Sequence, residues 1–260
     1  MMNSLWIAKT GMDAQQANLD TISNNLANAS TTAYKSMTPM FADLMYQTLR
    51  EPGSYSMNQT LNPDGLQVGS GAAMVATSRQ NTAGALLTTG NPLDVAIKGN
   101  GYFRIQMPDG TQAYTRDGSF SLNQNGMIVT SAGYQVGNGI TLPSGVTSTT
   151  INPDGSVQYT LQDPTKVYTA GNLIVTNFLN PNGLVATGGN LFLETSASGA
   201  PVINQPGTSG TGSIMQNTLE QSNVDVAGQL VNMISAQRLY EIQARAITAS
   251  DQMLQRIGQL

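Results

Sequence analysis

The chain has 260 residues, of which only 10% are charged and none is cysteine or histidine, and its formal net charge is −4. These absences exclude disulfides, thiolate nucleophiles, imidazole bases and metal sites with His or Cys ligands. The slightly acidic balance, without any basic run, argues against nucleic acid as a partner. Because globular proteins average about 25% charged residues, the polar surface must come mainly from Asn, Gln, Ser, Thr and Gly.

The opening stretch MMNSLWIAKTGMDAQQ does not read as a secretory signal. A signal needs a continuous apolar run of about 7–15 residues, and here Lys9, Thr10 and Asp13 interrupt it. The sequence also contains no apolar run of the roughly 18 residues that a membrane-spanning helix requires. We therefore expect a cytosolic protein, or one exported by a route that leaves its N-terminus uncleaved.

Apolar residues near the N-terminus recur every seven positions, and a second series follows three positions later. This pattern over residues 4–29 is typical of the a and d positions of a coiled-coil helix. Gly11 lies inside the predicted helix and weakens it by up to about 1 kcal/mol relative to alanine. The two series are Leu5, Met12, Leu19 and Leu26, and Ala8, Gln15, Ile22 and Ala29.

Three asparagines, Asn24, Asn25 and Asn28, lie at the end of this predicted helix in the stretch SNNLANASTTAYK. Asparagine disfavours helix interiors because its amide competes for backbone hydrogen bonds. An amide carries donors and acceptors without charge, so it can be buried between subunits if it is hydrogen-bonded. The alternative is that these residues only end and cap the helix.

Residues 36–65 are predicted to be transitional. Thr38 followed by Pro39 favours the start of a short helix, which Pro52-Gly53 would end. The following SYSMNQTLNPDG is polar and rich in turn formers, typical of a surface extension. The residues expected on one face of the short helix are Phe41, Leu44, Met45 and Leu49.

From about residue 66 the apolar period changes to two, and turn sequences separate short apolar runs. Proline sets φ at the first turn position and glycine accepts a positive φ, so these turns predict an antiparallel β domain. The stretch PGTSGTGS at 206–213 is typical of a linker. The expected strands lie around 93–98, 120–122, 173–175, 178–179 and 191–193, and the turns are NPDG at 62–65 and 152–155, MPDG at 107–110, NQNG at 123–126 and NPNG at 180–183.

A second long helix is predicted near the C-terminus, with Ser222 or Asn223 as its cap. Its apolar residues form two stripes, which implies more than one neighbour. The helix either pairs with the N-terminal helix of its own chain or also packs against other copies. One stripe is Val226, Leu230, Met233, Gln237, Tyr240, Ala244, Ile247 and Leu254; the other is Leu239, Ile242, Ala246, Ala249, Met253 and Leu260.

No catalytic, cofactor or metal site is expected. Gly99-Asn100-Gly101 lacks the third glycine of a dinucleotide loop and is interpreted as a strand bend. Arg116-Asp117-Gly118 is interpreted as a hairpin turn. Carboxylate pairs support glycoside hydrolysis, but the available acids show no distinctive spacing. These acids are Asp94, Asp109, Asp117, Asp154, Asp163 and Glu194.

Three stretches together resemble the axial rod and hook proteins of the bacterial flagellum: SNNLANASTTAYK, residues 97–136 and residues 219–254. The opening SLWIAKTGMDAQQANLD, the length and the segment YQTLREPGSYSMNQTLNP at 46–63 resemble the members that build the distal rod. In that family such a segment is associated with stiffness. The chain departs from the family pattern where Ala33 and Asn217 stand in place of common glycines, and where Gly228 replaces a helix former.

The resemblance implies an α+β fold, in which long N- and C-terminal helices form a coiled-coil-like pair and flank a central antiparallel all-β domain. The implied divisions are an axial helix at 1–35, a connecting region at 36–95, a β-rich outer domain at 96–205, a linker at 206–218 and a second axial helix at 219–260. It implies that the terminal helices pack subunits together and that 46–63 stiffens the assembly. The implied packing residues are Leu5, Met12, Leu19, Leu26, Asn24, Asn25, Asn28, Leu230, Met233, Tyr240, Ile247 and Leu254, and the stiffening residues are Tyr46, Leu49, Pro52, Gly53, Tyr55, Met57, Leu61 and Pro63.

The function implied is that of a structural subunit of a helical tubular drive shaft, which carries torque from the motor to the hook. The implied partners are other copies of the chain, proximal rod proteins, the hook protein, the P- and L-ring bushing, the rod cap and the flagellar type III export apparatus. Neither a nucleic acid nor a small-molecule substrate or cofactor is expected. The implied location is the basal body, in the periplasm and reaching the outer membrane. Alternatives are a proximal rod or hook paralogue, or a secreted β-domain glycan hydrolase or adhesin.

Overall fold

The computed structural model describes residues 2–51, 53, 64–163, 165–208 and 210–257. The chain divides into two compact units, each built from segments that are distant in the sequence. We call them the helical unit, which comprises Met1–Ala27, Met37–Arg79 and Asp225–Leu260, and the β unit, which comprises Asn28–Ser36 and Gln80–Val224.

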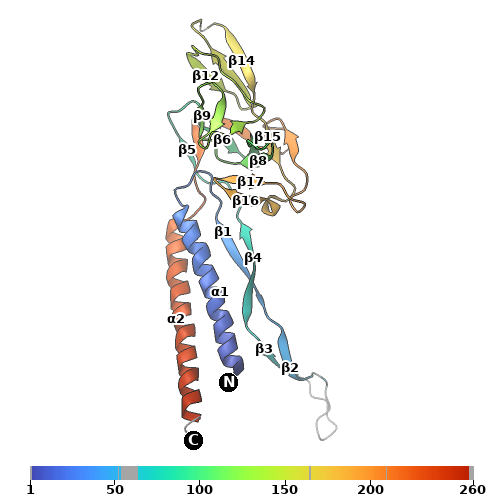
Figure 1. Ribbon diagram of the computed structural model, residues 1–260, viewed down its shortest axis with the longest axis vertical. Coiled ribbons are helices and arrows are strands. Elements are labelled where there is room, and N and C mark those ends of the chain that lie inside the picture. Colours follow the sequence, from blue (N-terminus) through green and yellow to red (C-terminus); the bar gives the residue numbers. More distant parts are fainter. Residues whose placement is uncertain (1, 52, 54–63, 164, 209, 258–260) are drawn as a thin grey trace. The chain divides into compact units, whose positions relative to one another are not determined.

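The helical unit combines the two terminal helices with a two-stranded ribbon (Figure 1). The two helices are in contact, and α1 also contacts β1 and β4. The ribbon consists of two antiparallel strand pairs that follow one another: β1 pairs with β4, and β2 pairs with β3. The elements are α1 (Met2–Ala27), β1 (Met37–Asp43), β2 (Tyr46–Arg50), β3 (Leu66–Gly69), β4 (Ala72–Arg79) and α2 (Val226–Ile257).

The short helix predicted from Thr38 onward is wrong, because residues 37–50 form β1 and β2. The backbone groups of β1 find partners in β4, far along the chain, and this pairing overrides the helix-like spacing of Phe41, Leu44 and Met45. Pro39, which lacks an N–H, is tolerated because β1 has a partner on one edge only.

The cap of α2 also differs from the prediction. The helix begins at Val226, and the Asp225 Oδ1 accepts a hydrogen bond from the Ala227 backbone N–H at 3.2 Å. Asp225 therefore occupies the capping position expected of Ser222 or Asn223. Gly11 of α1 lies against Gln243 of α2, whose amide nitrogen would be 3.1 Å from an added Cβ. A glycine inside α1 thus permits close approach of the second helix.

The β unit is antiparallel throughout its described pairings. Its largest sheet has the order β16-β17-β8-β7-β11-β10-β9, and β15 joins it by pairing with β7 and β18. Smaller sheets pair β12-β13-β14, β19-β6 and β20-β5. The elements are β5 (Leu86–Thr88), β6 (Val95–Lys98), β7 (Tyr102–Gln106), β8 (Gln112–Thr115), β9 (Phe120–Leu122), β10 (Ile128–Thr130), β11 (Gln135–Val136), β12 (Ser148–Ile151), β13 (Ser156–Thr160), β14 (Val167–Asn172), β15 (Val175–Asn177), a 3₁₀ turn (Pro181–Gly183), β16 (Val185–Gly188), β17 (Leu191–Leu193), β18 (Val202–Asn204), β19 (Ser213–Gln216) and β20 (Thr218–Glu220).

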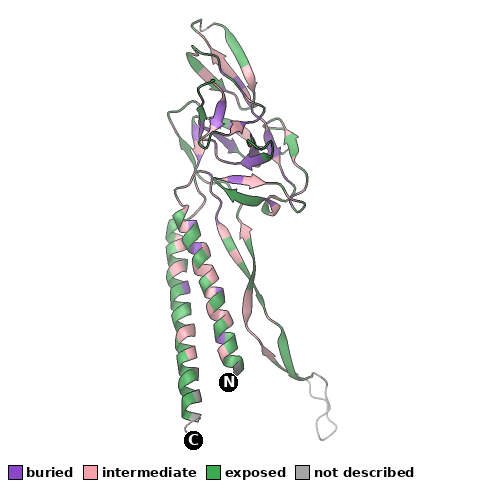
Figure 2. Cartoon of the chain, viewed as in Figure 1, coloured by how far each residue is buried: buried purple, intermediate pink, exposed green. Residues whose placement is uncertain are grey.

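The main hydrophobic core lies in the β unit, where Figure 2 shows most of the buried residues. Phe103 packs edge to face with Phe120 at a ring distance of 5.2 Å, and Val175 and Ile214 are fully buried beside them in the same cluster. Full burial of such a side chain contributes about 1.5–3 kcal/mol. Ile214 belongs to β19, so the stretch leading to the C-terminal helix helps to close this core.

Three of the predicted turns are hairpin turns. MPDG, NQNG and NPDG at 152–155 join β7 to β8, β9 to β10 and β12 to β13, and their glycines have φ of +84°, +74° and +88°. NPNG at 180–183 instead forms the 3₁₀ turn, and Leu179, predicted to lie in a strand, is 94% exposed outside any strand. The fold class is confirmed: two terminal helices in contact flank a central antiparallel β region.

Two further expectations for the β unit need correction. The stretch at 206–218 is not a plain linker, because it contains β19, which pairs with β6. Arg116-Asp117-Gly118 is not a hairpin turn, because β8 and β9 on either side pair with other strands. The bend at Gly99-Asn100-Gly101 is confirmed, since it lies between β6 and β7 with both glycines at positive φ.

Candidate assembly surface

Helix α2 exposes most of its apolar side chains. Among its residues with described side chains, only Ala236 is buried, while Ile242 is 59% and Met253 is 52% exposed. On α1, Trp6 is 54% exposed. A wide exposed apolar surface is typical of an interaction site. The large apolar residues exposed on α2 are Val226, Leu230, Val231, Ile234, Leu239, Tyr240, Ile242 and Met253.

The predicted packing residues divide between partly buried and exposed positions. Leu5, Met12, Leu19 and Leu26 on α1 are partly buried, and the fully buried apolar positions of that helix are Ala8, Ala14 and Ile22. On α2, Met233 and Ile247 are partly buried, Leu230 and Tyr240 are exposed, and the side chain of Leu254 lies outside the described residues. The second stripe, with Leu239, Ile242 and Met253, is open.

The ribbon of the helical unit exposes a second group of apolar side chains. Tyr46 is 54% and Leu49 is 60% exposed, and Gly53 is exposed with φ of +79°. Of the predicted stiffening residues, Pro52, Tyr55, Met57, Leu61 and Pro63 lie outside the described part of the chain. Other exposed apolar residues of the ribbon are Met40, Phe41, Met45, Leu66, Met74 and Val75.

The three asparagines at and just after the end of α1 occupy different environments. Asn25 is buried, its Nδ2 donates to the Met37 carbonyl at 2.7 Å, and its Oδ1 accepts from the Met37 N–H at 2.9 Å. Asn28 is partly buried, and its Oδ1 accepts from the Thr31 hydroxyl at 3.1 Å; Asn24 is exposed. Asn25 therefore joins the end of α1 to the start of β1. Packing of these asparagines between subunits stays a prediction.

A buried cluster of charges lies in the β unit, and sequence reasoning did not single it out. The Lys35 ammonium lies 2.5 Å from Oε1 of Glu220, and Arg116 Nε lies 2.6 Å from Oε2 of the same carboxylate. Glu220 also accepts a hydrogen bond from the Gly84 N–H, and Lys35 donates to the Thr82 carbonyl. The only sequence signal was that Lys35 and Glu220 each lie within a stretch that carries the family resemblance.

The pKa values of this cluster follow from burial and mutual attraction. Burial alone raises the pKa of the Glu220 carboxyl, but the charges and hydrogen bonds of Arg116 and Lys35 outweigh it and hold this pKa below its ordinary value. Burial lowers the pKa of Lys35, against the stabilising effect of Glu220. The Glu220 carboxylate is thus ionised near neutral pH.

Two residues that depart from the family pattern take the backbone conformation that glycine favours. Ala33 has φ of +56° and Asn217 has φ of +57°. The left-handed conformation is therefore required at position 33 even without glycine, and Asn217 is a residue type that tolerates it. Ala33 is buried and its N–H donates to the Glu220 carbonyl at 2.8 Å, so this turn brings the N-terminal segment beside the charge cluster.

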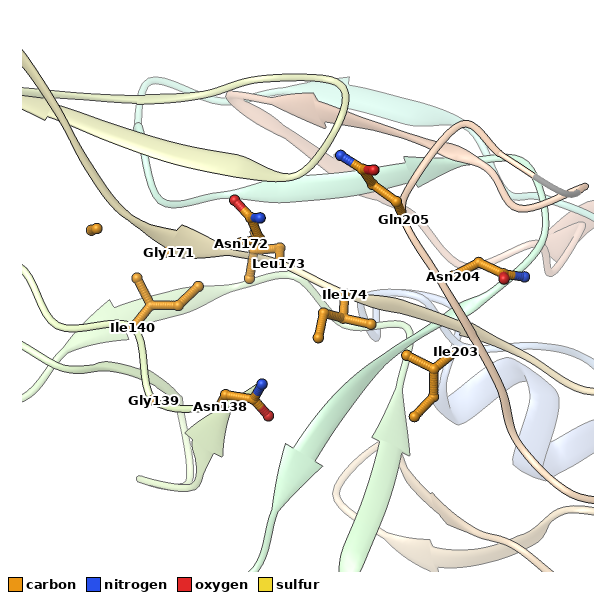
Figure 3. Close-up of a pocket in the computed structure, with 11 residues that line it drawn as sticks. Asn138, Gly139, Ile140, Gly171, Asn172, Leu173, Ile174, Ile203, Asn204 and Gln205 are labelled. Carbon is orange, nitrogen blue, oxygen red and sulfur yellow. The ribbon is translucent and has the colours of Figure 1, made fainter.

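A hollow of about 580 Å³ on the β unit is shown in Figure 3. It is lined by carboxamides around β11, β14 and β18 and by aliphatic side chains, and none of its lining residues is charged. This lining provides no general acid or base. The side chains that define it are Asn138, Asn172, Asn204, Gln205, Ile140, Ile174 and Ile203.

Comparison with known proteins covers both ends and the middle of the chain. Residues 5–35 match the flagella basal body rod protein family, residues 96–159 the D1 domain of the flagellar hook protein FlgE/F/G family, and residues 215–260 the C-terminal region of the flagellar basal body rod FlgEFG protein family. The chain is 50% identical to the flagellar basal-body rod protein FlgG of Buchnera aphidicola subsp. Acyrthosiphon pisum over 260 residues, all of both chains. The chain belongs to the FlgG family of flagellar basal-body rod proteins.

Other FlgG relatives agree along the whole length. The identity is 45% to the Caulobacter vibrioides protein over 260 residues, which are 100% of this chain and 99% of the relative. It is 37% to the Bacillus subtilis protein over 266 residues, again 100% and 99%. This membership confirms the predicted family and a structural, non-enzymatic role as a distal rod subunit of the basal body.

No helix in the described part of the chain combines the length and apolar character needed to cross a bilayer.

Proposed function

We propose that many copies of this FlgG-family chain assemble through their terminal helices into a hollow helical shaft that transmits torque from the motor to the hook. In this proposal the helices within 1–35 and 219–260 form the axial core, 96–205 forms the outer layer, and 36–95 connects them. The observation that carries the proposal is the open apolar stripe of α2, because a helix with one buried residue among its described side chains needs further partners.

The energetics favour several contacts per subunit. Covering half-exposed side chains such as Leu239, Ile242 and Met253 contributes about 1 kcal/mol each. Association costs about 4–15 kcal/mol in lost translational and rotational freedom. A single helix contact is too weak to exceed this cost, whereas a subunit with neighbours on both helices and the ribbon gains enough. The arrangement therefore favours a polymer over a dimer.

The proposal includes a route and a set of partners. The chain would leave the cell interior through the flagellar type III export apparatus, without cleavage of its N-terminus, and assemble beneath a rod cap in the periplasm. The shaft would join proximal rod proteins at one end and the hook protein at the other, and would turn inside the P- and L-ring bushing up to the outer membrane. The FlgG family membership supports this placement.

Polymerisation of the purified protein tests the proposal. We expect straight tubes by electron microscopy as concentration is raised, or on isolated basal bodies used as seeds. Leu19→Asp and Met233→Asp should each abolish tube formation because they introduce a charge at the helix surfaces, while the β unit keeps its thermal transition. A parent chain that stays monomeric at every concentration and on seeds, or variants that form normal tubes, would contradict it.

The segment at 46–63 is proposed to stiffen the shaft by bridging neighbours. Its described part exposes Tyr46 and Leu49 to possible neighbours. Deleting 46–63 should leave subunits that polymerise into bendable tubes, measured as a shorter persistence length in micrographs. The control is substitution of 46–63 by Gly/Ser repeats of the same length. A deletion of equal length in the PGTSGTGS region is unsuitable, because β19 begins there at Ser213. Unchanged straightness would reject the bridging role.

A further inference from the structure

We propose that Lys35, Arg116 and Glu220, together with Asn223, form a clasp that fastens both helix-bearing ends of the chain to the core of the β unit, so that neither end is released alone. The inference deepens the proposed function, because a shaft subunit must carry force between its helices and its β unit. The clasp itself lies wholly within the β unit.

The two ends of the chain meet directly at the clasp. Lys35 belongs to the segment that follows α1, and Glu220 and Asn223 belong to the segment that precedes α2. Besides the Lys35–Glu220 ion pair, the Ser36 N–H donates to Asn223 Oδ1 at 2.7 Å. The backbone adds bonds from Ala33 N–H to the Glu220 carbonyl at 2.8 Å and from Asn223 N–H to the Tyr34 carbonyl at 3.3 Å.

The clasp is anchored to the sheets through Arg116. Beyond its bond to Glu220, the Arg116 guanidinium donates to three backbone carbonyls around the bend between β6 and β7. These acceptors are Gly101 at 2.9 Å, Ile97 at 3.1 Å and Gly99 at 2.5 Å. A guanidinium is suited to this role because its five donors have a fixed, planar geometry.

A third segment completes the closure. Asn223 Nδ2 donates to the Gln80 carbonyl at 2.9 Å, and Lys35 donates to the Thr82 carbonyl at 2.8 Å. Residues 28–36, all of which the structure describes, form no strand, so the segment after α1 has no sheet ladder to hold it. It is held instead by the Glu220 carboxylate and the Asn223 amide, by the Asn190 amide, which donates to the Thr32 carbonyl at 3.1 Å, and by backbone bonds such as that from the Gln80 N–H to the Ser36 carbonyl at 2.8 Å.

The charges explain why the two ends should open together. Glu220 is 2% exposed and neutralises both cations, so removing its charge leaves the Lys35 ammonium and the Arg116 guanidinium buried and partly unpaired. The Lys35 side chain would then move toward water and withdraw the segment after α1. The strand β20, which carries Glu220, keeps its backbone pairing with β5 but loses the side-chain bonds that join it to Lys35 and Arg116.

Hydrogen–deuterium exchange on the full-length monomer tests this clasp. We expect Glu220→Gln to raise exchange about tenfold or more in both 28–36 and 218–224, with little change in β7, β8 and β15. Glu194→Gln, which contacts Tyr114 in the same unit, is the matched control and should leave both segments protected. If Glu220→Gln does not fold, Lys35→Met decides, because it removes the ion pair that joins the two ends and should still raise exchange in both segments.

Three results would overturn the clasp: unchanged protection of the two segments, release of one segment alone, or a uniform loss across the β unit. The measurement uses monomers, so it is independent of polymerisation. A chain that forms no tubes but releases both segments together would refute the proposed function and support the clasp. Normal tubes, together with release of one segment without the other, would support the proposed function and refute the clasp.

Discussion

The buried amide of Asn25 provides a sharp test of how α1 is joined to the ribbon. Its Nδ2 donates to the Met37 carbonyl at 2.7 Å and its Oδ1 accepts from the Met37 N–H at 2.9 Å. Aspartate has nearly the same shape, but an ionised carboxylate cannot donate. Asn25→Asp therefore keeps the second bond, loses the first, and places a negative charge against a carbonyl oxygen.

The magnitude follows from these contacts. Leaving a buried carbonyl without its donor costs about 1–3 kcal/mol. The variant avoids the charge by protonating the new aspartate; at pH 7, about 3 units above its ordinary pKa, this costs up to about 4 kcal/mol. We expect a loss of about 2–5 kcal/mol in the free energy of unfolding of the helical unit at pH 7. Because the protonated acid restores the donor, the loss should shrink by up to about 1.4 kcal/mol per pH unit as the pH falls toward 4.

Urea unfolding followed by far-UV circular dichroism measures this, at pH 7 and at pH 5. Asn232→Asp is the matched control, because Asn232 belongs to the same unit and is exposed on α2. The control should stay within about 0.5 kcal/mol of the parent. The reasoning is refuted if Asn25→Asp costs no more than the control, or if its cost is the same at both pH values.

Three further predictions concern the β unit. Ala33→Gly should stabilise it by up to about 1 kcal/mol and Ala33→Val should destabilise it, because φ is +56°; urea midpoints measure both. Gly118→Ala should prevent normal folding of the unit, seen as lost near-UV dichroism, since the added Cβ would lie 1.7 Å from the Val95 carbonyl oxygen. In acid, Glu220 has a folded pKa below its unfolded value of 4.5, so the unfolded chain binds more protons and stability falls as pH drops below about 4.5. Calorimetry from pH 6 to 3 should show a smaller decline in Glu220→Gln.

The repeating parts of the fold could be predicted from the sequence, because their signal is local. The seven-residue spacing from Leu5 to Leu26 predicted α1, and the Pro-Asp-Gly and Asn-Gly turns predicted three hairpins, since each depends on residues that are neighbours in the chain. The helix expected after Thr38 was wrong for the opposite reason. Its spacing fits a helix, but its backbone partners in β4 lie beyond the turn of the ribbon.

The charge cluster could not be predicted from spacing. Lys35 and Glu220 are 185 residues apart in the sequence. A single lysine or glutamate is ordinarily expected on the protein surface. Arg116 was interpreted as part of a turn, although its guanidinium is buried among backbone carbonyls. The two apolar stripes of α2 could be recognised in the sequence, but their exposure could not, because an exposed face shows the same period as a buried one.

The pairing of β6 with β19, in which Ile97 lies opposite Ile214, also bears on the order in which the molecule matures. When the chain is synthesised from its N-terminus, β6 has no pairing partner until β19, near the C-terminus, has been made. Contacts between residues so far apart in the sequence also form slowly. The pairing of β6 with β19 therefore delays the folding of the β unit. In the export route that we propose, this delay would help the chain to pass through the export channel before its β unit folds.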